Sequence, residues 1–150
     1  MTDYTIRRAR RGDVGAIVRM LADDQLGATR DDPRDLEQYL RAFDEIDADA
    51  NQLLMVAASD DEPVGTLQLT IIPGLARRGA LRGQIEAVRI HVDHRGSGLG
   101  AEIMRWAIDE SRRRGCALVQ LTSDVSRTAA HRFYERLGFE PTHTGFKLKL

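Results

Sequence analysis

The feature that most constrains the fold is a glycine-rich segment at residues 94–100, which reads His-Arg-Gly-Ser-Gly-Leu-Gly. An apolar stretch at residues 84–92 precedes it and predicts a strand, while Ile103, Trp106 and Ala107 follow at the spacing of a helix. A strand, a glycine turn and a helix start form an anion site, because glycines let the backbone approach a ligand and several N–H groups converge there. The sequence therefore predicts a site for a phosphate-bearing ligand.

Two known nucleotide patterns can be tested against this segment. Gly96-x-Gly98-x-x-Ala101 fits the dinucleotide fingerprint, but that fold needs an acidic residue about 20 positions further on. Residues 116–121 contain none, and too little chain follows Gly100 for the usual six-stranded sheet. A P-loop is excluded because the sequence has no GxxxxGK(S/T) motif.

The remaining chain predicts a mixed α/β domain. Apolar alternation and turn residues predict strands at residues 4–9, 53–58, 64–72, 84–92, 117–122 and 146–150. Helical spacing and capping residues predict helices that begin near Asp13, near residues 32–33, after the glycine segment and near Ala130. Residues 23–30 are predicted to form a loop, and residues 73–83 a Gly- and Arg-rich connection.

Composition predicts one cytoplasmic domain over residues 1–150. The hydrophobic fraction of 42% suits an ordinary core, and no apolar run reaches the ~20 residues of a membrane span. The start of the chain lacks the apolar stretch of a signal peptide. Cys116 is the single cysteine, so no internal disulfide can form, and four histidines without a second cysteine do not predict a zinc site.

Charge is distributed unevenly along the chain. Residues 1–62 carry 15 Asp and Glu against 8 Arg, and residues 63–150 carry 8 Asp and Glu against 14 Arg and Lys. The basic half is consistent with a ligand that carries several phosphates, although a chance split between two faces gives the same totals. A net charge of −1 argues against a general nucleic-acid binder.

Two segments of the chain form a recognisable pair: Arg95-x-x-Gly98-x-Gly100, and AHRFYERLGF at residues 130–139. With them the chain resembles the GCN5-related N-acetyltransferase (GNAT) family, because the first resembles the family's pyrophosphate-binding motif and the second its A-x-x-(L/F)-Y-x-x-x-G-F segment. The resemblance implies a mostly antiparallel central sheet of about six or seven strands, flanked by about four helices. It implies acetyl-CoA as co-substrate without a metal, direct transfer to a primary amine, and a homodimer.

The resemblance also implies which residues hold acetyl-CoA. Carried over position by position, they are Ile90, His91, Val92, Arg95, Gly96, Ser97, Gly98, Leu99, Gly100 and Arg127. Val92 stands where proline is common, and Arg127 stands where many members have the asparagine that contacts the pantetheine arm. A guanidinium at that position can bind the same carbonyl or a phosphate. Backbone N–H groups freed by a bulge around residues 90–92 could stabilise the thioester oxygen.

Two side chains are candidates for proton transfer. Tyr134 could protonate the leaving thiolate, because a phenol with a pKa near ~10 is only slightly less acidic than a thiol near ~8.5; the alternative role is core packing. Glu86 could act as base, directly or through water, and even spacing places it on the face of Val88 and Ile90. The alternative for Glu86 is a structural ion pair, with Arg89 or Arg105 as its partner.

The acceptor is expected to be the amine of a small molecule, or alternatively of a protein or peptide. Arg77, Arg78 and Arg82 lead into a strand and would suit an acidic acceptor, whereas the acidic residues around 23–24 and 31–32 would suit a cationic one. His91 is expected to be exposed, and Cys116 has no neighbouring base that would make it a nucleophile. A second hypothesis for the chain is a non-catalytic acyl-CoA-binding sensor or interaction protein.

Overall fold

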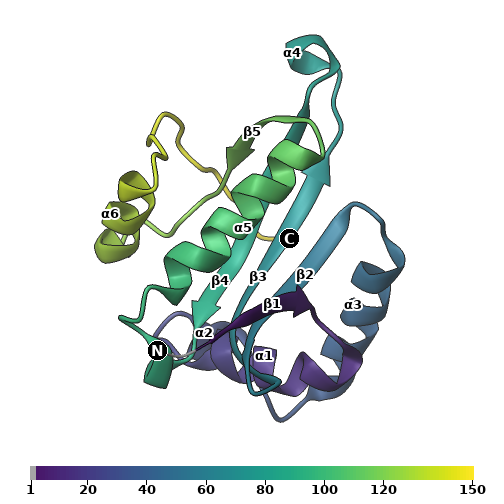
Figure 1. Cartoon of the computed structure of the whole chain (residues 1–150), viewed down its shortest axis with the longest axis vertical. Helices are drawn as coiled ribbons and strands as arrows, with labels where there is room; N and C mark the ends of the chain where they lie inside the picture. The colour runs from purple at the N-terminus through teal and green to yellow at the C-terminus, as the bar shows by residue number, and fades with distance from the viewer. Residues whose placement is uncertain (1–2) are drawn as a thin grey trace.

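The computed structural model describes residues 3–150 and contains a five-stranded sheet with the order β1-β2-β3-β4-β5 (Figure 1). Neighbouring strands are antiparallel except β4 and β5, which are parallel. The strands are β1 (Thr5–Arg8), β2 (Gln52–Ser59), β3 (Glu62–Ile72), β4 (Leu81–Ile90) and β5 (Cys116–Gln120). The mixed, mostly antiparallel α/β fold is confirmed, with five strands where about six or seven were expected.

Four helices of nine residues or more flank the sheet, in line with the expected number. They are α1 (Val14–Ala22), α3 (Leu36–Ala48), α5 (Leu99–Arg113) and α6 (Thr128–Arg136). The shorter elements are α2 (Gly27–Arg30), α4 (Ala76–Gly79) and the 3-10 turns η1 (Arg11–Asp13) and η2 (Val92–His94). The predicted loop at 23–30 thus contains a short helix, and α3 begins after residues 32–33.

The core lies on both faces of the sheet, as the alternation in β2 requires. On one face α5 buries Ile103 and Met104 completely against Leu67 and Leu69 of β3. On the other face α1 and α3 pack against even-numbered residues of β2, with Val56 at the centre. Figure 1 shows α5 crossing the front of the sheet, with α1 and α3 grouped around β2. The sheet is therefore the middle of three layers.

The predicted strand at residues 146–150 is absent. Residues 140–150 contain no helix or strand, and the side chains of Phe146, Leu148 and Leu150 are exposed. The alternation of apolar residues is that of a strand, but a strand also needs a neighbour to satisfy its backbone groups. Within this chain the segment has no such neighbour, so the prediction of a closing strand was wrong.

Membrane crossing has no candidate segment among residues 3–150, because no helix there combines the necessary length and apolar content. In the same part of the chain, no three His, Cys, Asp or Glu side chains are grouped as metal ligands.

An ion pair links the residue before α1 to β1, the edge strand of the sheet. Arg7 on β1 donates to both carboxylate oxygens of Asp13 at 2.7 and 3.1 Å, and the Arg10 backbone N–H donates to the same carboxylate at 2.7 Å. Burial alone would raise the pKa of Asp13, but these hydrogen bonds and the positive charges of Arg7 and Arg10 lower the pKa below its usual value. The ionised carboxylate therefore stabilises the folded state.

We expect Asp13→Asn to lower the free energy of unfolding by about 1–3 kcal/mol at pH 7, because charge-assisted hydrogen bonds are lost. The contribution of Asp13 is present above the usual carboxyl pKa of about 4 and is lost as pH falls through its lowered folded value. Denaturant unfolding at pH 7 and pH 3 measures the difference. If the difference in free energy of unfolding between variant and native chain is as large at pH 3 as at pH 7, this account is contradicted.

Candidate functional site

A β-bulge in β4 organises the site. Gln68 on β3 pairs with Glu86 and Thr66 pairs with Arg89, so two residues of β4 lie opposite Leu67 alone. Ala87, inside the bulge, has a φ of 56°, a left-handed conformation rare for alanine. The bulge reverses the alternation along β4, with a direct consequence for the predicted base.

Glu86 does not share a face with the apolar residues that follow it. Val88 and Ile90 pack on the core beneath α5, whereas Glu86 pairs with Gln68, whose side chain lies on the opposite face among polar groups. The expectation of a common face assumed a regular strand and was wrong, because the extra residue shifts the period by one. The same shift places Arg89 on the face of Glu86.

Beyond the bulge, β4 has lost its neighbour on one side. β5 pairs with β4 only from Leu81 to Gln84, so the last residues of β4 have an open edge. The His91 N–H donates to the Val64 carbonyl of β3 at 2.8 Å, so by alternation the N–H of Ile90 is directed to the open edge. The N–H groups near residues 90–92 were expected to be free. That of Ile90 is directed to the open edge of β4, whereas that of His91 is hydrogen-bonded to β3.

The glycine segment closes the end of this opening. Gly96 and Gly98 have φ angles of 76° and 86°, and Gly98 is the N-cap of α5, so the turn uses backbone conformations that suit glycine. The position of a Cβ on Gly100 lies 3.4 Å from the ring of Phe133, which is contact distance, so α6 packs beside the start of α5. The predicted strand, glycine turn and helix N-terminus are therefore present.

The side chains of Arg95 and Ser97 stabilise this turn through hydrogen bonds to backbone carbonyls. The Arg95 Nε donates to the Ile90 carbonyl at 3.1 Å, and the Ser97 hydroxyl donates to the His94 carbonyl at 2.6 Å. The Arg95 guanidinium lies 3.6 Å from the Asp23 carboxylate and is half exposed, so it can contact a ligand at the turn.

Tyr134 on α6 contributes a partly buried phenol that lies close enough to Arg89 of β4 for their charges to interact. Its ring packs against Phe133 and Phe139, with centroid separations of 5.4 and 6.1 Å. Burial raises the pKa of Tyr134, while the positive charges of Arg127 and Arg89 oppose that rise. The phenol is therefore protonated at neutral pH and can donate a proton. The two roles considered for Tyr134, packing and proton donation, are compatible in this geometry.

Glu86 is part of a chain of polar side chains across the sheet. The Gln120 amide donates to Gln84 at 2.8 Å, and the Gln84 amide donates to the Glu86 carboxylate at 2.7 Å. Among residues 3–150 Glu86 forms no ion pair, so neither Arg89 nor Arg105 is the partner that was considered. The side chain is exposed, which leaves its second oxygen open to water or to a substrate.

Arg89 is the functional candidate that sequence reasoning missed. Its side chain is 15% exposed, and its Nε lies 3.3 Å from the Asp24 carboxylate, which comes from the segment between α1 and α2. Burial lowers the pKa of Arg89, the Asp24 charge raises it, and the positive charge of Arg127 lowers it again. The charge of Arg127 near the mostly buried Arg89 creates a place that favours an anion.

The other predicted residues lie elsewhere. Arg77 and Arg78 lie in α4, which Figure 1 shows at the end of the sheet opposite the start of α5, separated from it by the ten residues of β4 or roughly 30 Å. They do not border the glycine turn.

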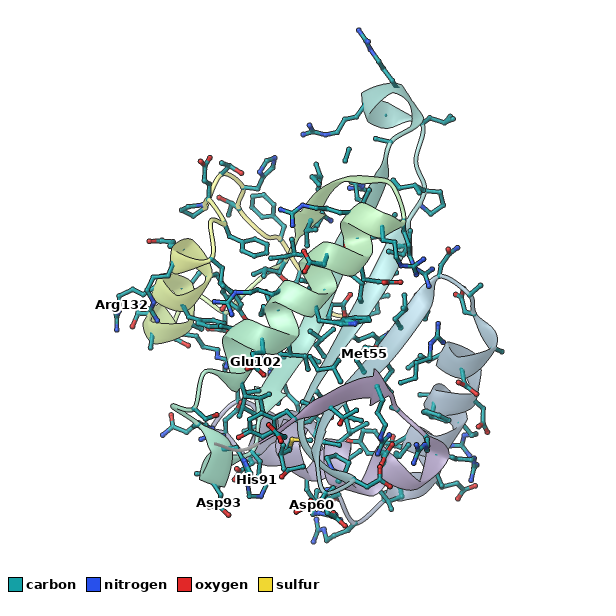
Figure 2. All side chains as sticks on the ribbon, in the orientation of Figure 1. Met55, Asp60, His91, Asp93, Glu102 and Arg132 are labelled. Carbon is teal, nitrogen blue, oxygen red and sulfur yellow. The ribbon has the colours of Figure 1, made fainter. Side chains whose placement is uncertain are left out.

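His91 lies directly after the last residue of β4. Figure 2 shows His91 near Asp93, and the His91 Nδ1 accepts from the Asp93 N–H at 3.2 Å. Burial raises the pKa of Cys116, which does not suit a nucleophile.

Comparison with known proteins identifies the family. A model described as the acetyltransferase (GNAT) family matches residues 16–139. The chain belongs to the GNAT family. A solved structure from Bacillus halodurans C-125, described as a transcriptional regulator, has a TM-score of 0.95 and 45% sequence identity, and the match covers 99% of this chain and 100% of that one.

Two curated relatives are named N-acetyltransferases. The aminoalkylphosphonate N-acetyltransferase of Salmonella typhimurium is 31% identical over 98 residues, which are 65% of this chain and 63% of the relative. The glucosamine 6-phosphate N-acetyltransferase of Trypanosoma brucei brucei is 36% identical over 87 residues, which are 58% and 57% of the two chains. The matches thus span less than two thirds of each relative. The expected GNAT family is therefore confirmed, and the family is described as one of acetyltransferases.

The glycine turn generates a prediction. We expect Gly98→Ala to destabilise the turn by about 1–2 kcal/mol, because an L-residue is strained in the left-handed conformation. It should also abolish most of the rise in melting temperature that CoA produces in the native chain. Gly12→Ala is the matched control, since Gly12 has an ordinary φ and no atom within 4 Å of an added Cβ. If CoA raises the melting temperature of Gly98→Ala as much as that of the native chain, the glycine turn does not take part in binding CoA.

Proposed function

We propose that the chain is an acetyl-CoA-dependent N-acetyltransferase that transfers the acetyl group directly to a primary amine of a small molecule. One observation carries this proposal: the open edge of β4, the N-terminus of α5 and a partly buried tyrosine belong to one opening of the sheet. Membership in the GNAT family supports acetyl-CoA as the donor.

Binding of acetyl-CoA is assigned mainly to backbone groups. The N–H groups of residues 96–100 and the positive end of the α5 dipole would hold the pyrophosphate, with Arg95 and Arg127 as nearby cations. The residues carried over from the family pattern, Ile90, His91, Val92, Arg95, Gly96, Ser97, Gly98, Leu99, Gly100 and Arg127, are proposed to line this path.

The reaction requires one bond to form and one to break. The Ile90 N–H would donate to the thioester oxygen as negative charge develops there, while the amine nitrogen bonds to the acetyl carbon. As the carbon–sulfur bond breaks, Tyr134 would give its proton to the sulfur and later recover one from water. Glu86, directly or through water, would accept the proton that the amine loses and would then release it to water, so that both side chains return to their starting states. The products are the acetylated amine and CoA.

We expect Tyr134→Phe to lower kcat by roughly 10²–10³-fold, the usual scale of general acid catalysis. Binding of acetyl-CoA should change little, because the ring and its packing on Phe133 and Phe139 are kept. Steady-state assays of CoA thiol release, together with calorimetric titration of acetyl-CoA, separate the two effects. An unchanged kcat would remove Tyr134 from the mechanism.

Glu86 is tested through the pH dependence of kcat/KM. A base that must be ionised produces a loss of activity as pH falls, and Glu86→Gln should abolish that acid limb and lower kcat/KM about 10²-fold. Glu45→Gln is the matched control, because Glu45 is exposed on α3. An acid limb that persists in Glu86→Gln would assign the titration to another group.

The acceptor is proposed to carry an anionic group near its amine. Arg89 supports this, because its mostly buried side chain lies on the face of Glu86 with only Asp24 as its ion-pair partner among residues 3–150. The two curated relatives are named for acceptors that combine an amine with a phosphonate or phosphate. A guanidinium suits such groups because its paired N–H donors match two oxygens.

We therefore expect Arg89→Gln to raise KM for aminoalkylphosphonates and amino sugar phosphates by about 10–100-fold, since a hydrogen bond to a charged group is lost. KM for an uncharged amine of similar size should change less than twofold. Arg41→Gln on the exposed face of α3 is the matched control. An equal rise in KM for charged and uncharged amines would show that Arg89 supports the fold and does not recognise the anion.

The second candidate function, a non-catalytic acyl-CoA-binding sensor, is favoured by the description of the Bacillus halodurans relative as a transcriptional regulator. Parallel thermal-shift titrations with acetyl-CoA, CoA and NADH test the donor site, because a ligand at a hundredfold excess over its Kd stabilises by about 2.7 kcal/mol. Thiol release against a panel of amines then separates the candidates. Tight binding without turnover would favour the sensor, and a response to NADH alone would overturn both.

A further inference from the structure

A cavity lies on the face of the sheet that α1 and α3 cover. Its volume is about 180 Å³, and it is lined by side chains of α1, α3, β2 and β3 together with Ala87 of the bulge. Three lining residues carry polar side-chain atoms, namely Tyr39, Thr66 and Gln68, and all the others are aliphatic or aromatic hydrocarbons. The wall of the cavity is therefore mainly apolar.

The polar side chains of this lining form hydrogen bonds with groups outside the cavity. The Thr66 hydroxyl donates to a backbone carbonyl of β2 at 2.8 Å, and the Gln68 amide donates to the Gln52 side chain at 2.9 Å. The Tyr39 hydroxyl donates to the Asp31 carboxylate at 3.0 Å. A group inside the cavity is therefore stabilised mainly by burial of its apolar surface, and a polar group there would lose its hydrogen bonds to water.

The pairing of β3 with β4 places this cavity beside the two side chains assigned to the acceptor. Gln68 pairs with Glu86 and Thr66 pairs with Arg89, and both of these β3 residues line the cavity. Ala87, which lines it as well, lies between Glu86 and Arg89 in the bulge. The floor of the cavity therefore lies next to the proposed base and next to the proposed anion site.

The cavity extends from an exposed rim into the core. Ala87 of the bulge and Ala42 of α3 are exposed, whereas Val18 and Phe43, which also line the cavity, are buried. A group that enters beside Ala87 therefore passes from the polar face of β4 into an apolar space.

We propose that this cavity binds an apolar substituent of the acceptor, of about the size of a phenyl ring. The inference rests on the proposed function and names its substrate class: a carbon atom that bears a primary amine for Glu86, an anionic group for Arg89, and an aromatic or branched aliphatic side chain for the cavity. An apolar cavity of about 150 Å³ binds benzene, so a cavity of about 180 Å³ has room for a ring and its attached methylene group.

Binding without turnover is the first test, with 2-phenylethylphosphonate and ethylphosphonate as probes. Neither probe has an amine, so neither can be acetylated on nitrogen. With CoA present, calorimetry should give a Kd about 10–100-fold lower for the phenyl compound, because its ring is buried. Methyl NMR should show shifts at Leu21 and Ile46, which line the cavity. Equal Kd values for the two probes would overturn the inference.

Two variants change the volume of the cavity. Ala42→Phe places a ring at its wall and should bring the two Kd values within about twofold, because burial of the probe's ring is lost. Ala48→Phe is the matched control, since Ala48 is exposed at the end of α3 and does not line the cavity. Ile46→Ala enlarges the cavity and should shift the preference from the phenyl compound toward a 2-naphthyl analogue by about tenfold. Melting temperatures verify that each variant folds, and an unchanged preference in both cavity variants would overturn the inference.

Turnover separates this inference from the proposed function. We expect kcat/KM for 1-amino-2-phenylethylphosphonate to exceed that for 1-aminoethylphosphonate by about 10–100-fold, and the free amino acids phenylalanine and alanine form a parallel carboxylate series. The series with the higher kcat/KM identifies the anionic group. Turnover of both members of each series at equal kcat/KM would overturn the inference and leave the proposed function standing. Absence of turnover with any amine, together with tight binding of 2-phenylethylphosphonate that Ala42→Phe abolishes, would support the cavity as a binding site and overturn the proposed function.

Discussion

The bulge at Ala87 is the local irregularity on which the rest of the site depends. By placing two residues of β4 opposite Leu67, it rotates the following part of the strand. Three consequences follow together: Glu86 and Arg89 lie on one face, Val88 and Ile90 return to the core, and β4 diverges from β5. The left-handed φ of Ala87 costs on the order of 1–3 kcal/mol, which packing on both sides of the sheet must offset. A regular strand would have kept the two strands paired and the backbone groups of Ile90 occupied.

The parts of the site that could be predicted from the sequence are local ones. The glycine turn was predictable because Gly96 and Gly98 encode an unusual backbone conformation directly, and the start of α5 follows within two residues. The helix that carries Tyr134 was predictable for a similar reason, since its apolar spacing is continuous. In both cases a few neighbouring residues contain all the physical information.

Other expectations failed because they depended on partners far away in the sequence. The face of Glu86 depends on pairing with β3, and the position of Arg77 depends on the length and direction of β4. The pairing of Arg89 with Asp24 joins β4 to a segment some sixty residues earlier, and no periodicity in either segment indicates it. At residues 146–150 alternation predicted a strand and was wrong, because a strand also requires pairing with a neighbour, and this segment pairs with none of the described strands.

The division between backbone and side chains in this site has a consequence for how it can vary. The proposed donor site depends on N–H groups, a helix dipole and glycine conformations, which tolerate many changes of side chain elsewhere. Recognition of the acceptor is assigned to Arg89, Asp24 and the segment between α1 and α2, where single substitutions alter charge and shape directly. The two sets are not independent, because the Arg95 guanidinium of the glycine turn lies 3.6 Å from the Asp23 carboxylate of that segment. Arg127, which lies close enough for its charge to affect both Arg89 and Tyr134, is a second residue through which a change in the acceptor set would affect the donor side.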